Sequence, residues 1–224
     1  MIKIDANLFR IAYTAVSTEE TRYYLNGVHI EAHPEKGAIL VSTDGHRMIV
    51  AHDPEGECSE SVIVKLPRFA LAQCKTPTMF TAKRVLEINP TLPGSATIKE
   101  VTPGKKNEAP KIEDVITVHR AIVDGAFPDW RRVIPYTPTE APNAAPTSFN
   151  PRYMKAWGDV GMELKKAHLG TEEMQIALST GGNPVIIRWS GAVNIFGVQM
   201  PMRSSVSGYL PAFLDKPEFR EAAE

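Results

Sequence analysis

The chain has few cysteines and lacks any long apolar run. Its 224 residues include only Cys58 and Cys74, which form no disulfide framework, so a reducing compartment is the simpler interpretation. No uninterrupted apolar stretch reaches the roughly 18 residues of a membrane span. The first residues, MIKIDANLF, lack the apolar segment of a signal peptide. We therefore expect a cytoplasmic protein with no membrane partner.

The chain also lacks an excess of charge of either sign. Its formal net charge is −1 and its pI is near 6.6, which argues against a protein that holds DNA by bulk positive charge alone. Local basic faces are still compatible with this balance. Hydrophobic residues make up 43% and charged residues 23% of the chain, as in ordinary globular proteins. The length suits one sizeable domain, with or without a smaller second one.

Motifs of catalytic and metal sites are missing as well. No Gly-rich phosphate loop or serine nucleophile elbow occurs. HIEAH, residues 29–33, is only superficially similar to a zinc protease motif, because a strand would not bring its histidines together. Its first three residues resemble a zinc deaminase motif, but no Pro-Cys-x-x-Cys follows. His46, His52 and Cys58 lack the usual close ligand pair. We predict no catalytic residue, metal or cofactor.

A proline-rich stretch divides the chain. PYTPTEAPNAAPT, residues 135–147, favours an extended connector over helix or sheet. The predicted division is a first domain over residues 1–135, a linker over 136–147, a partial second domain over 148–204 and a tail over 205–224.

Helical and strand patterns alternate along the chain. Leu8 and Ile11 lie at helical spacing behind a possible Asp5 cap. VHIEAH, AILVSTD and HRMIVAHD then read as strands, the last two joined by an Asp-Gly turn at 44–45.

The same order recurs later in the chain. Pro67 could begin a second, short helix before the strands SATIKEV and ITVHRAIV, with a polar hairpin loop over residues 102–111 between them. Asn150 and Pro151 suit the start of a third helix, which precedes strands in MQIALS, NPVIIRW and AVNIFGVQM. Helix followed by strands therefore occurs about three times, which predicts an α+β fold with antiparallel sheets.

Four ordered stretches together give a specific resemblance: ETRYYLNGV at 20–28, STDGHRM at 42–48, DGAFPDWRRVIP at 124–135 and MPMR at 200–203. This set resembles the bacterial sliding clamp family, the β subunit of DNA polymerase III. The resemblance implies the DNA-clamp fold of repeated helix-plus-strand units. Residues 1–135 resemble the whole middle domain of that family and residues 149–203 the second half of its last domain. The family's first domain and half of its third have no counterpart.

In that family, partner proteins insert a short, mostly apolar peptide into a cleft between the middle and last domains. The resemblance implies that the cleft residues here are Leu25, Thr43, Gly45, His46, Arg47, Met48, Pro128, Arg132, Val133, Asn150, Tyr153, Val198, Met200, Pro201, Met202 and Arg203. Leucine, valine and methionine would form an adaptable floor, and the polar members could hold a peptide backbone. The alternative is that Leu25, Val133 and Met200 are ordinary core residues and Arg132 a surface charge.

The resemblance also implies helices that present basic side chains to the backbone of double-stranded DNA without reading bases. By position, the DNA-facing candidates are Arg10, Lys65, Arg68, Lys75, Arg152 and Lys155. Lys165 and Lys166 fit the solvated C-terminal end of a helix better than a DNA-facing role.

The expected function is therefore that of a non-catalytic processivity factor that encircles DNA as a homo-oligomer, with a DNA polymerase, other clamp-binding proteins and a clamp loader as partners. A phage-type origin would fit the short chain. The alternative is a non-encircling adaptor or decoy that captures clamp-binding peptides. The tail, with Leu210, Phe213 and Leu214, could pack on the body or occupy a cleft.

Overall fold

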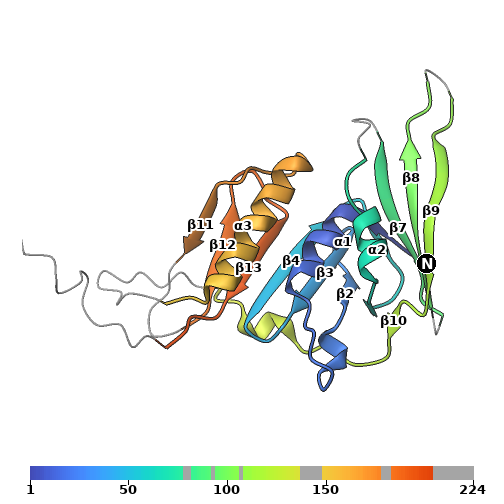
Figure 1. The fold of residues 1–224 in the computed structure, drawn as a ribbon. Coiled ribbons are helices and arrows are strands. Elements are labelled where there is room, and N and C mark those ends of the chain that lie inside the picture. Colours follow the sequence, from blue (N-terminus) through green and yellow to red (C-terminus); the bar gives the residue numbers. More distant parts are fainter. Residues whose placement is uncertain (78–81, 92–93, 106–107, 137–147, 178–182, 204–224) are drawn as a thin grey trace, which may run out of the picture.

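The computed structural model describes residues 1–77, 82–91, 94–105, 108–136, 148–177 and 183–203. The linker predicted over 136–147 lies almost wholly outside these residues, and the tail predicted over 205–224 lies entirely outside them. Within the described residues the chain forms two antiparallel sheets and three α-helices (Figure 1).

The larger sheet has eight strands in the order β10-β6-β2-β3-β4-β13-β12-β11. Their bounds are β2 Val28–Ala32, β3 Ala38–Thr43, β4 Arg47–Asp53, β6 Val62–Val64, β10 Ile122–Val123, β11 Met174–Ala177, β12 Val185–Trp189 and β13 Ile195–Gln199. The pairing of β4 with β13 joins segments far apart in the sequence, with Val198 opposite Met48. The first and last parts of the chain thus share one continuous sheet.

The smaller sheet has five strands in the order β5-β1-β7-β8-β9. Their bounds are β1 Ile2–Asp5, β5 Glu57–Cys58, β7 Lys83–Asn89, β8 Ser95–Thr102 and β9 Lys111–His119. β1 precedes the first helix yet pairs with β7, while β6 precedes the second helix and pairs with β2. β1 therefore joins the sheet that contains β7, β8 and β9, and β6 joins the sheet that contains β2, β3 and β4.

The helices are α1 Ala6–Ala12, α2 Arg68–Gln73 and α3 Pro151–Lys166, and short 3-10 turns are η1 Tyr13–Ala15, η2 Tyr23–Leu25 and η3 Trp130–Val133. The predicted caps are confirmed: the Asp5 side chain accepts a hydrogen bond from the Leu8 amide, and the Asn150 side chain accepts one from the Arg152 amide. Proline at the first turn of α3 fits because that position has no intrahelical amide partner.

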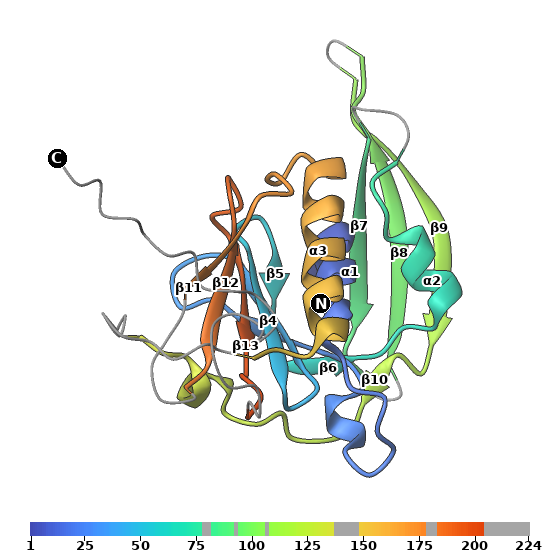
Figure 2. The same cartoon turned by 60° about the vertical axis from the view of Figure 1, so that its left-hand side comes forward.

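The main core lies between the helices and the sheets. Phe9, Leu40, Leu86 and Trp157 are fully buried in it. In Figure 2, α1 lies behind α3, and an ion pair between Arg10 and Glu163 links the two helices. These two helices thus occupy one face of the eight-stranded sheet, while α2 packs against β9 of the smaller sheet.

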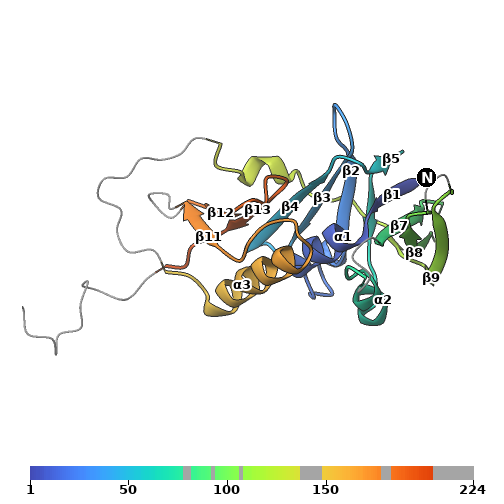
Figure 3. The ribbon, with the colours of Figure 1, turned by 90° about the horizontal axis from the view of Figure 1, so that it is seen from above.

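A second, smaller core lies on the opposite face of that sheet. Its buried members are Ile39, Val41, Met48, Val50, Trp130 and Val198. In Figure 3, η3 lies across the sheet from α1 and α3. Residues just before and within η3 therefore cover the outer face of the β4–β13 junction.

The α+β class with antiparallel sheets, helix-plus-strand units and the Asp44-Gly45 hairpin are confirmed. No strand was predicted for β1, β5, β6 or β7. β1 and β6 are only 4 and 3 residues long, too short for a period to stand out, and each pairs with a strand far along the chain.

Candidate functional site

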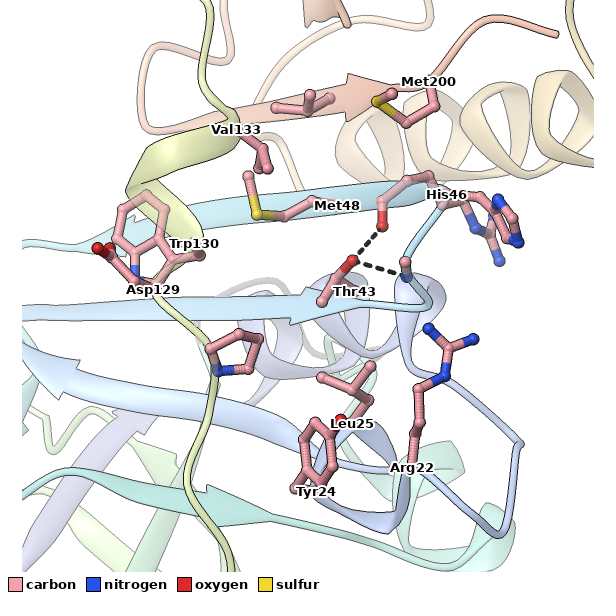
Figure 4. Close-up of a pocket in the computed structure, with 14 residues that line it drawn as sticks. Arg22, Tyr24, Leu25, Thr43, His46, Met48, Asp129, Trp130, Val133 and Met200 are labelled. Carbon is pink, nitrogen blue, oxygen red and sulfur yellow. Dashed lines mark hydrogen bonds between the residues drawn. The ribbon is translucent and has the colours of Figure 1, made fainter.

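A pocket of about 290 Å³ opens beside the β4–β13 junction (Figure 4). Its lining residues are Arg22, Tyr24, Leu25, Thr43, Gly45, His46, Arg47, Met48, Pro128, Asp129, Trp130, Val133, Val198 and Met200. They come from η2, the β3–β4 turn, the segment that includes η3, and β13 with the residue after it. The pocket is therefore assembled from distant parts of the chain.

The tight turn between β3 and β4 shapes one rim of the pocket. Gly45 has a φ of +89°, which glycine adopts without the penalty other residues incur. The Thr43 hydroxyl accepts a hydrogen bond from the Gly45 amide at 3.0 Å and donates to the Arg47 carbonyl at 2.7 Å. The Asp44 carboxylate accepts from the His46 and Arg47 amides at 2.9 and 3.0 Å. Local hydrogen bonds thus fix the rim.

Arg47 is held by groups of its own chain. Its Nε donates to Asp44 at 3.0 Å and its Nη2 to the Thr14 carbonyl at 2.9 Å. Its guanidinium carbon lies 4.8 Å from the centroid of the Tyr153 ring. Burial raises the pKa of the Tyr153 hydroxyl, and the Asp44 carboxylate raises it further. Arg47 therefore ties the turn to η1 and α3.

His46 connects the turn to the end of β13. Its carbonyl accepts hydrogen bonds from the Met200 amide at 2.9 Å and from the Gln199 side chain at 3.2 Å. Its ring lies 6.2 Å from that of Tyr153. The backbone of His46 therefore has a structural role, while its ring lies beside that of Tyr153.

The floor of the pocket is apolar. Leu25, Met48 and Val198 are buried, whereas Met200 and Val133 are 39% and 48% exposed. Exposed apolar side chains around a concave site favour binding of an apolar group, and methionine adapts its shape to different ligands.

The structure brings most of the expected cleft residues together. Leu25, Thr43, Gly45, His46, Arg47, Met48, Pro128, Val133, Val198 and Met200 line the pocket, whereas Arg132, Asn150, Tyr153, Pro201, Met202 and Arg203 do not. Arg132 pairs with Asp129 at 2.9 Å with its side chain 82% exposed. Asn150 caps α3, and Met202 forms an isolated bridge with Ser148.

Sequence reasoning missed four lining residues: Arg22, Tyr24, Asp129 and Trp130. All of them lie within the stretches ETRYYLNGV and DGAFPDWRRVIP. The sequence therefore predicted that these segments contribute to the cleft, but not that these four residues do. These four residues were not assigned singly, because the direction of their side chains depends on the 3-10 turns.

The expected DNA-facing residues lie on or beside the helices. Arg68, Lys75, Arg152 and Lys155 are exposed, as is Lys65 after β6. Lys155 forms a surface pair with Asp159 at 2.6 Å. Arg10 is only partly exposed and pairs with Glu163 of α3, so it contributes to helix packing. Lys165 and Lys166 pair with Glu172 and Glu163.

The histidines weighed as metal ligands have other contacts. His29 stacks on Phe127 and contacts Glu31, and the His52 ring contacts the Lys36 carbonyl. Among the described residues, no group of three or more His, Cys, Asp or Glu side chains is arranged to hold a metal ion. Within the same residues, no helix is long and apolar enough to span a membrane.

Comparison with known proteins finds sliding clamps that are similar to this chain. The family profile of the DNA polymerase III beta subunit, central domain, matches residues 6–129. The beta sliding clamp of Escherichia coli strain K12 is 30% identical over 181 residues, covering 81% of this chain and 43% of that protein. The beta sliding clamp of Caulobacter vibrioides is 36% identical over 126 residues, covering 54% of this chain and 30% of its own. The chain thus spans less than half the length of these relatives.

Solved structures agree on the fold. The Bacillus subtilis sliding clamp superposes with a TM-score of 0.59 at 17% identity, covering 91% of this chain and 64% of that one. The Bartonella birtlesii clamp bound to griselimycin gives 0.56 at 20% identity, covering 89% and 64%. With the profile match and the E. coli relative, these findings establish that the chain belongs to the DNA polymerase III beta subunit, or sliding clamp, family.

Proposed function

We propose that this protein is a non-catalytic processivity factor whose pocket at the β4–β13 junction binds short apolar peptides of a DNA polymerase and other replication proteins. The observation that carries the proposal is the pocket itself. It combines an apolar floor with a rim fixed by the Asp44-Gly45 turn, and most of its residues lie within the stretches that resemble the sliding clamp family. An apolar site of this kind suits a peptide with large apolar side chains and a few polar contacts at its ends.

The helix face is the proposed DNA-facing surface. Arg68, Arg152 and Lys155 are exposed there, and contacts of lysine and arginine with phosphates bind DNA without sequence specificity. A closed ring keeps DNA by topology, so the net charge of −1 is compatible with the proposal.

Residence on circular DNA tests the encircling part of the proposal. The full chain is loaded on nicked circular plasmid with a clamp loader, and its retention is followed in high salt before and after a restriction enzyme linearises the plasmid. A ring stays on the circle and slides off the linear ends. Equal loss from both forms would contradict encirclement, because surface binding depends on salt and not on ends.

A second candidate is a non-encircling adaptor or decoy. Every residue that lines the pocket belongs to this one chain, so peptide capture needs no closed ring. Light scattering across a concentration series separates the two. An oligomer whose mass stays the same across concentrations supports the clamp, and a monomer at all concentrations that still binds peptide supports the adaptor.

Peptide affinity of a chain that ends at residue 204 tests the role of the tail. Unchanged peptide affinity would exclude Leu210, Phe213 and Leu214 as a competing ligand of the pocket.

A further inference from the structure

One wall of the pocket is a segment that, among the described residues, makes no backbone hydrogen bond to the sheet it covers. Residues 124–134 contribute Pro128, Asp129, Trp130 and Val133 to the pocket. Their backbone hydrogen bonds, from Arg132 to Asp129 and from Ile134 to Arg131, stay within the segment in the part of the chain that the structure describes. Side chains must therefore hold this wall in place.

Two side chains on the outer face of β2 contact this segment at two points. The His29 ring stacks on the Phe127 ring with centroids 4.8 Å apart and an interplanar angle of 6°. Glu31 accepts a hydrogen bond from Arg131 at 2.5 Å. Pro128, Asp129 and Trp130 lie between these two attachment points. The strand period places His29 and Glu31 on the same face of β2, two residues apart.

The two attachment points are coupled to each other. His29 Nε2 lies 3.1 Å from Glu31, and because a carboxylate only accepts hydrogen bonds, this nitrogen carries the proton. The guanidinium carbon of Arg131 lies 4.2 Å from the Trp130 ring, a distance that allows a cation–π contact. A continuous chain of contacts thus runs from β2 to a side chain that lines the pocket.

We propose that His29, Glu31 and Arg131 are positioning residues of the peptide site. They contact no ligand themselves, and hold the wall formed by Pro128, Asp129 and Trp130 in its binding geometry. Burial supports this role, since the side chains of His29 and Glu31 are 13% and 17% exposed. The inference rests on the proposed peptide-binding function and identifies what makes that site ready to bind.

The expected effect is on affinity more than on stability. Substitutions at the Glu31–Arg131 pair change no side chain of the second core, so we expect the fold to persist while the wall samples other positions. If the wall then holds its binding geometry about one fifth of the time, the apparent Kd rises about fivefold.

The test uses the full chain and a fluorescein-labelled heptapeptide with two adjacent large apolar side chains. Its Kd is measured by anisotropy for the wild type, Glu31→Gln, Arg131→Gln and the double variant. The matched control is Glu55→Gln, since Glu55 makes an exposed ion pair with Lys36 at 2.8 Å and lies outside the pocket. Arg131→Lys serves as the conservative rescue, and melting temperatures are measured in parallel.

We expect each single variant to weaken binding about fivefold, with the double variant no weaker than either single one, because both break the same pair. Glu55→Gln keeps wild-type affinity, Arg131→Lys regains part of the loss, and melting temperatures stay close to the wild type. Wild-type affinity in both single variants would overturn the positioning role while leaving peptide binding intact. Absence of wild-type binding would overturn both.

Discussion

Arg47 reaches across the junction of the two parts of the chain and stacks its guanidinium on Tyr153 of α3, 4.8 Å from the ring centroid. Its Nε donates to the Asp44 carboxylate and its Nη2 to the Thr14 carbonyl. The side chain is only 13% exposed. An arginine that the sequence places in a binding cleft is thus also a structural link.

Removal of Arg47 should therefore lower stability. Arg47→Ala is expected to reduce the free energy of unfolding by about 2 kcal/mol, because charged hydrogen bonds are lost. Arg47→Lys should recover only part of this, since an ammonium group cannot reproduce the planar fork. Urea denaturation measures both.

The control for this prediction is Arg132→Ala. The Arg132 side chain is 82% exposed, so its removal should change the free energy of unfolding by no more than about 0.5 kcal/mol. Equal effects of the two alanine variants would contradict the structural role of Arg47.

Gly45 should tolerate no side chain without cost. Its φ of +89° disfavours an L residue, so Gly45→Ala is expected to reduce the free energy of unfolding by about 1 to 2 kcal/mol. Gly158 on α3 is the matched control: a Cβ there would meet nothing within 4 Å. Gly158→Ala should raise stability by about 0.5 to 1 kcal/mol. Thermal unfolding should show a lower melting temperature for Gly45→Ala and a higher one for Gly158→Ala than for the wild type.

Asp5 should make stability depend on pH. Burial is the largest cause that raises the pKa of its carboxyl; the Leu8 amide opposes this in part, and the Asp53 carboxylate adds to it. The folded state therefore holds the proton more tightly than the unfolded state. The stability that results is present below the unfolded pKa and is lost as pH rises through the folded pKa.

Asp5→Asn keeps an N-cap and removes this titration. Its stability relative to the wild type should increase as pH rises through the range of the Asp5 carboxyl. Asp5→Ala removes the cap and should cost about 1 kcal/mol at low pH, where the wild-type carboxyl is neutral. A difference between wild type and Asp5→Asn that does not change with pH would disprove the assigned pKa direction.

The two cysteines should react at different rates. Burial raises the pKa of the Cys74 thiol to about 12, and its side chain is fully buried, so little thiolate forms and reagents cannot reach it. Cys58 is partly exposed. Mass spectrometry after brief treatment with iodoacetamide should find Cys58 modified first, and both modified after denaturation. Native labelling of Cys74 as fast as Cys58 would contradict this.

Local signals predicted the parts of the fold that depend on neighbouring residues. The Asp5 and Asn150 caps and the Asp44-Gly45 turn are each set by a few adjacent residues. The crossing of β1 and β6 between sheets, and the pairing of β4 with β13, join distant residues. No local pattern encodes such pairings, so they were not predicted.

The pocket likewise combines features set by adjacent residues with features set by distant ones. Its motifs were recognised as segments. The contribution of Trp130, however, depends on how η3 lies on the sheet, and the contact of Arg47 with Tyr153 depends on where α3 packs. The predicted domain limits and the assigned roles in peptide and DNA binding stay predictions until measured.

Peptide binding in the pocket is the central claim, and a titration tests it most directly. The labelled heptapeptide is titrated with the wild type, Met200→Ala and Val133→Ala, whose side chains are 39% and 48% exposed, so their removal leaves the core intact. We expect saturable wild-type binding, and about tenfold weaker binding for each variant, since loss of a buried apolar contact of about 1.4 kcal/mol changes Kd tenfold. Binding that does not saturate, or that is the same in all three proteins, would contradict the account.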